Sequence, residues 1–206
     1  LTYSFDLLYA MYEEDGYDAP EIPDLILKHN LYGVDICDRA AALAAFALCM
    51  KARAKDARFF RRMVQPNIIE LRDVRFEENE LRDYIRTLGL GDLFNQPVLK
   101  LLHQFEEAKN FGSLIQPCLD ERAIAFARRA IEAKDLGGQL FLRETHLKVL
   151  RVLEQAEALT QRYHVVVANP PYMGIRNANA KLRAFLEAEY ADTKYDLYSA
   201  FIEQSS

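Results

Sequence analysis

The amino-acid sequence predicts an α/β fold, a doubly wound parallel sheet that is interrupted by a long helical insertion. Two short apolar runs, 31–36 and 163–168, have the character of buried strands, and the second resembles a central parallel strand. A third run, 67–71, is rich in β-branched residues and follows Pro66. Helical patterns separate the three runs, and strands that alternate with helices favour a parallel sheet covered by helices.

Two helices are expected before the first strand. An apolar helical pattern begins at Leu1 with no capping residue before it, and a second helix opens after Pro20 and ends near Asn30. The first residue is not Met, and the last helical pattern stops at the chain end without a cap. Both ends are therefore expected to be internal to a longer protein.

Acidic residues stand at or just past the carboxyl ends of the first two predicted strands. Asp35 is the last acid of the first strand, and Asp38 is expected to cap a buried, alanine-rich helix over 39–55. Glu70 and Asp73 stand at and just past the end of the second strand. Because ligands of such sheets bind beyond the carboxyl ends of the strands, Asp35 is expected to line a ligand crevice together with residues that follow the third strand.

A helical pattern fills most of the chain between the second and third predicted strands. It is interrupted at LGLGD, NFGSLIQP and DLGG, which predicts about four helices, the last of them amphipathic over 138–159. Two more helices are expected after the third strand, over 179–190 and 195–204.

Composition places the chain among ordinary globular proteins. It has 206 residues, half of them apolar, and a net charge of −5, which opposes a free-standing DNA-binding domain. It has no apolar run that could span a membrane and no signal-peptide pattern, so a soluble, cytoplasmic protein is expected. Cys37, Cys49 and Cys118 lack CxxC spacing, and no histidine has partners at metal-ligand spacing, so we expect no metal site.

The segment after the third predicted strand carries the residues best suited to chemistry, Asn169, Pro170, Pro171 and Tyr172. An exocyclic amine on adenine is a poor nucleophile because its lone pair is delocalised into the ring. The side-chain carbonyl of Asn169 and the backbone carbonyl of Pro170 are acceptors that can hold such an amine, and the two prolines restrict the backbone between them. Tyr172 offers a face on which a flipped base can stack. The alternative interpretation of these residues is a rigid turn that leaves a strand.

Four segments in the same order resemble a known family. LYGVDICDRAAALAAFAL, NFGSLIQP, YHVVVANPPYMG and KYDLYSAFIEQ resemble the PglX-type adenine-specific DNA methyltransferases of BREX phage-defence systems, and more broadly the amino-methyltransferases with an NPPY signature. The resemblance covers nearly the whole chain. It implies that Asn169, Pro170, Pro171 and Tyr172 bind the target adenine, and that Asp35 binds the ribose hydroxyls of the cofactor S-adenosylmethionine.

The resemblance also implies a Rossmann-like S-adenosylmethionine-dependent methyltransferase fold that is incomplete here. The family's first strand and its glycine-rich cofactor loop are missing, and so is the part that reads DNA sequence, so the isolated chain is expected to be inactive. DNA, S-adenosylmethionine and other phage-defence subunits are the expected partners. The predicted parts are a cofactor-side part, a helical insertion and a catalytic part with the NPPY strand and the following helices, at 1–75, 76–161 and 162–206.

Three questions stay open at this stage. Relatives often use an acid at the end of the third strand of the family fold to contact the cofactor's adenine, and here either Glu70 or Asp73 fits. The NPPY geometry also suits methylation of another planar amide or amine, such as a protein glutamine. In a third hypothesis the chain is a non-enzymatic helical interaction module, in which NPPY is only a turn.

Overall fold

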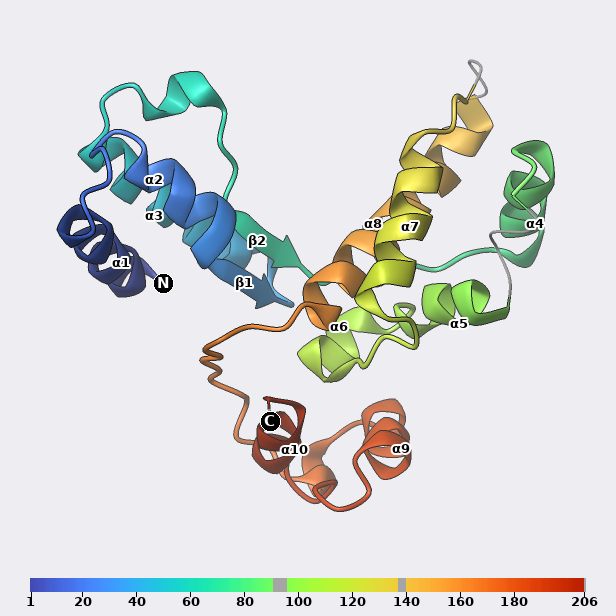
Figure 1. Ribbon diagram of the computed structural model, residues 1–206. Helices are drawn as coiled ribbons and strands as arrows, with labels where there is room; N and C mark the ends of the chain where they lie inside the picture. Colours follow the sequence, from blue (N-terminus) through green and yellow to red (C-terminus); the bar gives the residue numbers. More distant parts are fainter. Residues whose placement is uncertain (91–95, 137–139, 206) are drawn as a thin grey trace. The chain divides into compact units, whose positions relative to one another are not determined.

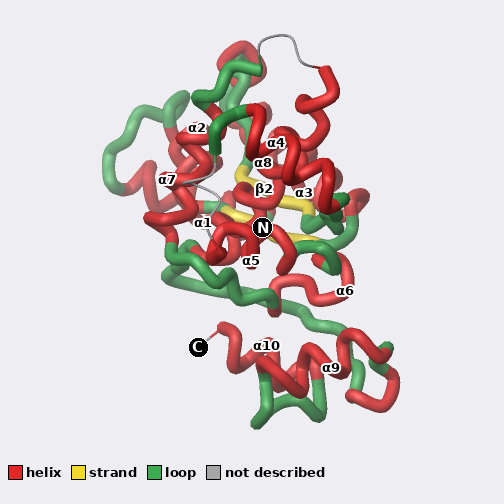
Figure 2. Tube along the Cα trace, turned by 90° about the vertical axis from the view of Figure 1, so that its right-hand side faces the viewer, coloured by secondary structure: helices red, strands yellow, loops and turns green. Residues whose placement is uncertain are grey.

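The computed structural model describes residues 1–90, 96–136 and 140–205, and the chain divides into two compact units (Figure 1). The first unit comprises Leu1–Leu71 and contains both strands of the described residues. The second unit comprises Arg72–Ser206 and is helical. Each unit is described by itself below. In Figure 2 the strands are the yellow segments, and red helices make up most of the remaining trace.

The first unit is a parallel β-α-β arrangement preceded by helices. The strands β1 and β2 pair in parallel, with Tyr32 opposite Asn67 and Asp35 opposite Glu70, and α3 is the crossover between them. This arrangement confirms the two strands and the order strand, acid, helix that the sequence predicts. The elements are α1 (Thr2–Glu14), α2 (Ile22–Leu25), the π-helical turn η1 (Ile26–Asn30), β1 (Tyr32–Asp35), α3 (Asp38–Lys55), η2 (Phe59–Arg62) and β2 (Asn67–Glu70).

The core of the first unit is made by apolar residues from its helices. Phe5 and Tyr9 of α1 pack with residues of α2, η1, α3 and η2, and Phe5 is fully buried. Arg62 links three segments at the edge of this core. Its guanidinium donates to both carboxylate oxygens of Asp24, at 2.8 and 2.9 Å, and forms an ion pair with Asp56 at 2.5 Å. The buried members are Phe5, Tyr9, Ile22, Ile26, Leu27, Leu31, Leu48, Ala52 and Phe59.

Two expectations for α3 were wrong. The N-cap residue is Cys37 rather than Asp38, because Asp38 already belongs to the helix, and within the described residues its carboxylate accepts from the next amide alone, at 2.8 Å. The helix is also not buried all round, since Leu43 and Phe46 are 67% and 62% exposed. A helix that packs on one face of two short strands buries a single stripe, and in α3 that stripe consists of Ala41, Leu48 and Ala52.

The second unit contains the helices that were expected between the second and third predicted strands. Figure 1 shows α7 and α8 side by side, and α8 also packs against α4 and α5. The predicted start of the last helix at Gly138 and the end of the LGLGD break lie outside the described residues. The elements are α4 (Glu78–Thr87), α5 (Gln96–Gln104), α6 (Ala108–Phe111), η3 (Gly112–Leu114), α7 (Glu121–Glu132), α8 (Leu140–Thr160), η4 (Ile175–Asn177), α9 (Ala180–Glu189) and α10 (Leu197–Ser205).

The predicted third strand, 163–168, is not a strand in the structure. The segment has no regular secondary structure and no strand partner among the described residues, and Val165, Val166 and Val167 are 79%, 52% and 92% exposed. β-Branched residues favour extended backbone, but a strand forms only where a neighbouring strand accepts and donates its backbone hydrogen bonds. The last two expected helices are confirmed as α9 and α10, and the side chain of Asn179 caps α9 by accepting from the amide of Leu182 at 2.9 Å.

None of the helices in the described part of the chain combines the length and the apolar character that a bilayer crossing requires.

A buried hydrogen bond joins α4 to α8 in the second unit. The hydroxyl of Tyr84, which is fully buried, lies 2.9 Å from Nδ1 of His146, which is 8% exposed. Burial raises the pKa of the Tyr84 phenol and lowers the pKa of His146. The phenol therefore stays protonated and donates to a neutral imidazole.

Acidification is expected to destabilise the chain through His146. Its pKa in the folded state lies below the value of about 6.5 that an unfolded histidine has, so the unfolded state binds more protons in this window. The stabilising contribution is complete above about pH 6.5 and is lost as the pH falls through the folded-state pKa. Thermal unfolding followed by circular dichroism between about pH 7.5 and pH 5 measures it.

Replacement of His146 by Gln is the matched test of this pH effect, because the glutamine carbonyl can still accept from Tyr84 and does not titrate. His146→Gln is expected to flatten the fall of the melting temperature below about pH 6.5. His164→Gln removes an exposed histidine of the same unit and serves as the control that keeps the wild-type profile. An equally steep profile in both variants contradicts the assignment to His146.

Candidate functional site

The NPPY segment carries two hydrogen-bond acceptors, on Asn169 and Pro170, that are not paired within the described residues. Asn169 and Tyr172 are exposed, whereas Pro170 is buried and anchors the segment. The carbonyl of Pro171 accepts from the amide of Met173 at 2.8 Å, which turns the chain directly after the second proline. The side chain of Asn169 and the carbonyl of Pro170 accept no hydrogen bond from any residue in the described ranges. Both acceptors that the sequence predicts for an amine therefore have no hydrogen-bond donor among the described residues, and Asn169 is the exposed one of the two.

An aromatic pair stands at the end of the motif. The rings of Tyr172 and Tyr198 are stacked, with centroids 6.4 Å apart and planes inclined by 24°. Tyr172 is 87% exposed and Tyr198, on α10, is 47% exposed. Two exposed rings in this arrangement offer a planar apolar surface of the kind on which nucleic-acid bases stack.

Backbone hydrogen bonds between two chain segments hold this pair together. The amide of Ile175 donates to the carbonyl of Tyr195 at 3.0 Å, and the amide of Leu197 donates to the carbonyl of Met173 at 3.2 Å. Gly174 and Asp196 form the antiparallel bridge between these bonds. The segment that follows NPPY is thus fixed to the start of α10, and this link connects Tyr172 to Tyr198.

Asp196 has a structural part in this link. Its carboxylate accepts from the amide of Tyr198 at 2.8 Å, which satisfies a donor of the first turn of α10. The sequence predicts the helix over 195–204 that begins near Asp196 and Tyr198. This helix is distant from NPPY in the sequence, so the NPPY motif alone does not show that Tyr172 and Tyr198 stack. The aromatic character of Tyr172 and Tyr198, and the presence of both residues in segments that resemble the family, are the signals that point to it.

The acid at the end of β1 stands beside an acid at the end of β2. Asp35 and Glu70 are register partners, so their Cα atoms face each other at the same edge of the parallel pair. Oδ1 of Asp35 accepts from the amide of Cys37 at 2.7 Å, which leaves Oδ2 without a partner among the described residues. A carboxylate oxygen that is exposed beyond a strand end can accept from ribose hydroxyls, so the residues present fit the nucleoside part of a cofactor.

Asp73 occupies a different environment from Glu70. It lies in the second unit, where its carboxylate accepts from the amide of Lys109 at 2.8 Å in the first turn of α6. Its neighbours are Glu107 and Lys181, which form an ion pair of 2.5 Å. This ion pair, the strongest influence on Glu107, holds the pKa of that carboxyl below its ordinary value. The carboxylate of Asp73 is thus hydrogen-bonded to the first turn of α6 within the second unit.

The structure brings together the four NPPY residues and adds Tyr198 to them. Asp35 belongs to the first unit together with Glu70, whereas NPPY belongs to the second. Each half of the predicted site is thus assembled within its own unit. The described residues contain no group of three His, Cys, Asp or Glu side chains that could hold a metal ion.

The parallel β-α-β unit and the NPPY segment are the two features that the family resemblance predicts, and the comparisons agree that the chain is a methylase fragment. Residues 29–206 match the model of the Eco57I restriction-modification methylase family, and the chain belongs to this family. It is 35% identical over 225 residues to the adenine-specific methyltransferase BrxX of Escherichia coli O9:H4 (strain HS), an alignment that covers 100% of this chain and 19% of that protein.

A second relative carries the name predicted from the sequence motifs. The chain is 31% identical over 208 residues to the adenine-specific methyltransferase PglX of Lacticaseibacillus casei (strain Zhang), an alignment that covers 99% of this chain and 17% of that protein. The resemblance to PglX-type methyltransferases is therefore confirmed. The chain spans about a fifth of the length of the curated relatives that it matches.

Proposed function

We propose that this chain supplies the adenine-holding residues, and part of the cofactor-holding residues, of a site-specific DNA methyltransferase. The enzyme transfers a methyl group from S-adenosylmethionine to the exocyclic amine of adenine in DNA and serves restriction-modification or phage defence. The observation that carries the proposal is the pair of acceptors at Asn169 and Pro170, without a donor among the described residues, next to the stacked rings of Tyr172 and Tyr198. Membership of a restriction-modification methylase family supports it.

The NPPY residues hold the amine and orient its lone pair. Oδ1 of Asn169 and the carbonyl of Pro170 accept the two hydrogens of the amine, which favours a lone pair directed out of the ring plane. The hydrogen bond from the amide of Met173 to the carbonyl of Pro171 restricts the backbone, so the acceptors of Asn169 and Pro170 are in place before the base arrives. Tyr172 stacks on the flipped base and offsets part of the cost of unstacking it from the duplex.

Asp35 and Glu70 are the proposed contacts to the nucleoside of S-adenosylmethionine. When bound, this cofactor supplies an electrophilic methyl group on a sulfonium. Asp35 accepts from the ribose hydroxyls through its open Oδ2, and Glu70 is preferred over Asp73 because it stands in register with Asp35 at the same sheet edge. The β-α-β unit is accordingly the cofactor-side part of a Rossmann-like methyltransferase fold, with 76–161 as the helical insertion and 162–206 as the catalytic part.

Product analysis of the full-length protein tests the proposed function. The protein is incubated with S-adenosylmethionine carrying a labelled methyl group and with unmethylated genomic DNA, and the nucleosides are then separated and identified by mass spectrometry. We expect the label in N6-methyladenine. The same analysis of co-purified proteins tests the alternative function, methylation of a protein glutamine. Label in glutamine and none in DNA contradicts a DNA methyltransferase. A protein that transfers no label at all favours the non-enzymatic helical module.

A further inference from the structure

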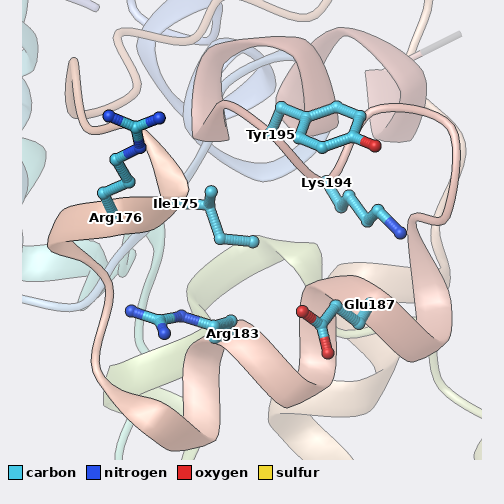
Figure 3. Close-up of a pocket in the computed structure, with 6 residues that line it drawn as sticks. All are labelled: Ile175, Arg176, Arg183, Glu187, Lys194 and Tyr195. Carbon is cyan, nitrogen blue, oxygen red and sulfur yellow. The ribbon is translucent and has the colours of Figure 1, made fainter.

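A pocket of about 400 Å³ lies in the second unit, directly after the NPPY segment (Figure 3). Its volume is in the range of roughly 300–1,000 Å³ that is typical of ligand sites. Arg183 and Glu187 project into it from α9, and Lys194 and Tyr195 come from the turn before α10. The lining residues are Ile175, Arg176, Arg183, Glu187, Lys194 and Tyr195.

Three of the six lining side chains are cations and one is an acid. Arg176 and Arg183 are exposed, and no carboxylate among the described residues lies within ion-pair distance of them or of Lys194. Among the described residues, the Arg183 guanidinium makes a single hydrogen bond, which it donates to the carbonyl of Ala178 at 3.3 Å. Nζ of Lys194 lies 5.5 Å from the ring centroid of Tyr195. The pocket therefore has an excess of positive charge whose hydrogen-bond donors are largely unused.

This charge contrasts with the rest of the chain. The net charge of the chain is −5, and many of its basic residues are paired with acids, as Arg62, Arg75 and Arg128 are. An excess of unpaired cations around one concave surface attracts anions even on an acidic protein, because the interaction decays within about 10 Å at ordinary salt.

The pocket and the proposed base site share the same backbone. Ile175 and Tyr195, which line the pocket, are joined by the hydrogen bond of 3.0 Å between the two segments that also connect Tyr172 to Tyr198. Arg176 is four residues from Tyr172, and Lys194 is four residues from Tyr198. An anion held in the pocket is therefore a near neighbour of any base held at NPPY.

We propose that this pocket binds a phosphate of the DNA backbone next to the flipped adenine, with Arg176, Arg183 and Lys194 as the contacts. The inference rests on the proposed function and adds to it a phosphate site that positions the strand. Arginine and lysine are the usual partners of backbone phosphates, and such contacts set the position of a protein on its DNA without reading sequence. Glu187 limits the strength of this site through like-charge repulsion.

The test measures binding of a short fluorescein-labelled DNA duplex to the full-length protein by fluorescence anisotropy, over a series of salt concentrations and without cofactor. Each phosphate contact contributes about 0.9 to the slope of log K against log salt concentration. The triple variant Arg176→Gln/Arg183→Gln/Lys194→Gln is expected to reduce the slope by about that amount and to weaken binding roughly tenfold at 0.1 M salt. Each single variant is expected to change the slope and the affinity in the same direction by a smaller amount. Glu187→Gln is expected to tighten binding.

Arg122→Gln is the matched control, because Arg122 is an exposed arginine of α7 outside the pocket. It is expected to retain the wild-type slope, and thermal unfolding of every variant checks that the fold is intact. Free phosphate at the concentration of the DNA phosphates is the competitor that separates a backbone site from a small-anion site, and displacement of the duplex by it overturns the proposal.

The outcome separates this inference from the proposed function. If the full-length protein forms N6-methyladenine and the three cation variants bind DNA with the wild-type slope, the pocket assignment is wrong and the proposed function stands. If no methyladenine is formed, the proposed function fails on its own measurement. Tighter DNA binding by Glu187→Gln together with weaker binding by the cation variants supports the phosphate site in particular. General damage to the fold would weaken DNA binding in every one of these variants.

Discussion

Replacement of Asn169 by Ala in the full-length protein is expected to lower kcat for adenine methylation by about 10²–10³-fold, by analogy with removal of one preorganised polar group from an active site. The reason is that Oδ1 of Asn169 is one of two acceptors that localise the lone pair of the amine. The side chain is exposed and unpartnered within the described residues, so its loss is expected to change stability by no more than about 0.5 kcal/mol. Initial rates with saturating cofactor and DNA measure the effect.

Two further variants make this expectation specific. Asn169→Asp keeps an acceptor oxygen at the same place and is expected to retain more activity than Asn169→Ala. Asn177→Ala removes an exposed asparagine of η4 a few residues downstream and is expected to leave the rate unchanged. Affinity for the cofactor should be the same in all three. Wild-type turnover of Asn169→Ala is the result that overturns the role of the side chain.

The β-α-β unit was predictable because its signals are local. Pro66 marks the start of the second strand, the apolar run ending at Asp35 marks the first, and an alanine-rich helix between them fits a right-handed crossover. The register that places Glu70 opposite Asp35 was not available from the sequence, since the strands are only four residues long and either Glu70 or Asp73 satisfied the pattern. Only the pairing itself separates the two acids.

The three valines after Tyr163 show the opposite case. Val165, Val166 and Val167 have as strong a strand preference as any run in the chain, yet the segment is exposed and unpaired. Strand formation depends on partners, which a local pattern does not contain. Helices α9 and α10 were predictable for the complementary reason, because their backbone bonds are internal and Asn179 supplies a cap to α9.

The candidate site also has a part that the sequence predicts and a part that it does not. The NPPY residues are contiguous, so the motif shows all four at once, and the acceptors of Asn169 and Pro170 have no donor among the described residues. Tyr198 and the cations Arg176, Arg183 and Lys194 come from separate turns and helices. The hydrogen bonds between 173–175 and 195–197, and the apolar packing of α9 against α10, bring them together. Such dispersed sets carry no spacing signal.

Asp35→Asn is expected to weaken binding of S-adenosylmethionine to the full-length protein by about 10–150-fold. A hydrogen bond to a charged acceptor contributes about 1.5–3 kcal/mol, and the carboxamide keeps the shape of the side chain but loses the charge. Oδ1 of the asparagine still accepts from the amide of Cys37, so the turn between β1 and α3 is preserved. Isothermal titration calorimetry with the cofactor measures the loss.

The neighbouring acids supply the controls for Asp35→Asn. Glu70→Gln is expected to weaken cofactor binding as well, since Glu70 is the register partner of Asp35, whereas Asp73→Asn is expected to leave it unchanged because that carboxylate accepts from Lys109 in the second unit. Asp38→Asn changes an exposed acid in the first turn of α3 and tests whether local charge alone matters. If Asp38→Asn and Asp35→Asn weaken cofactor binding equally, the effect of Asp35→Asn comes from the local negative charge and not from a contact to the ribose. If Asp73→Asn weakens cofactor binding and Glu70→Gln does not, the second acid is Asp73 and not Glu70.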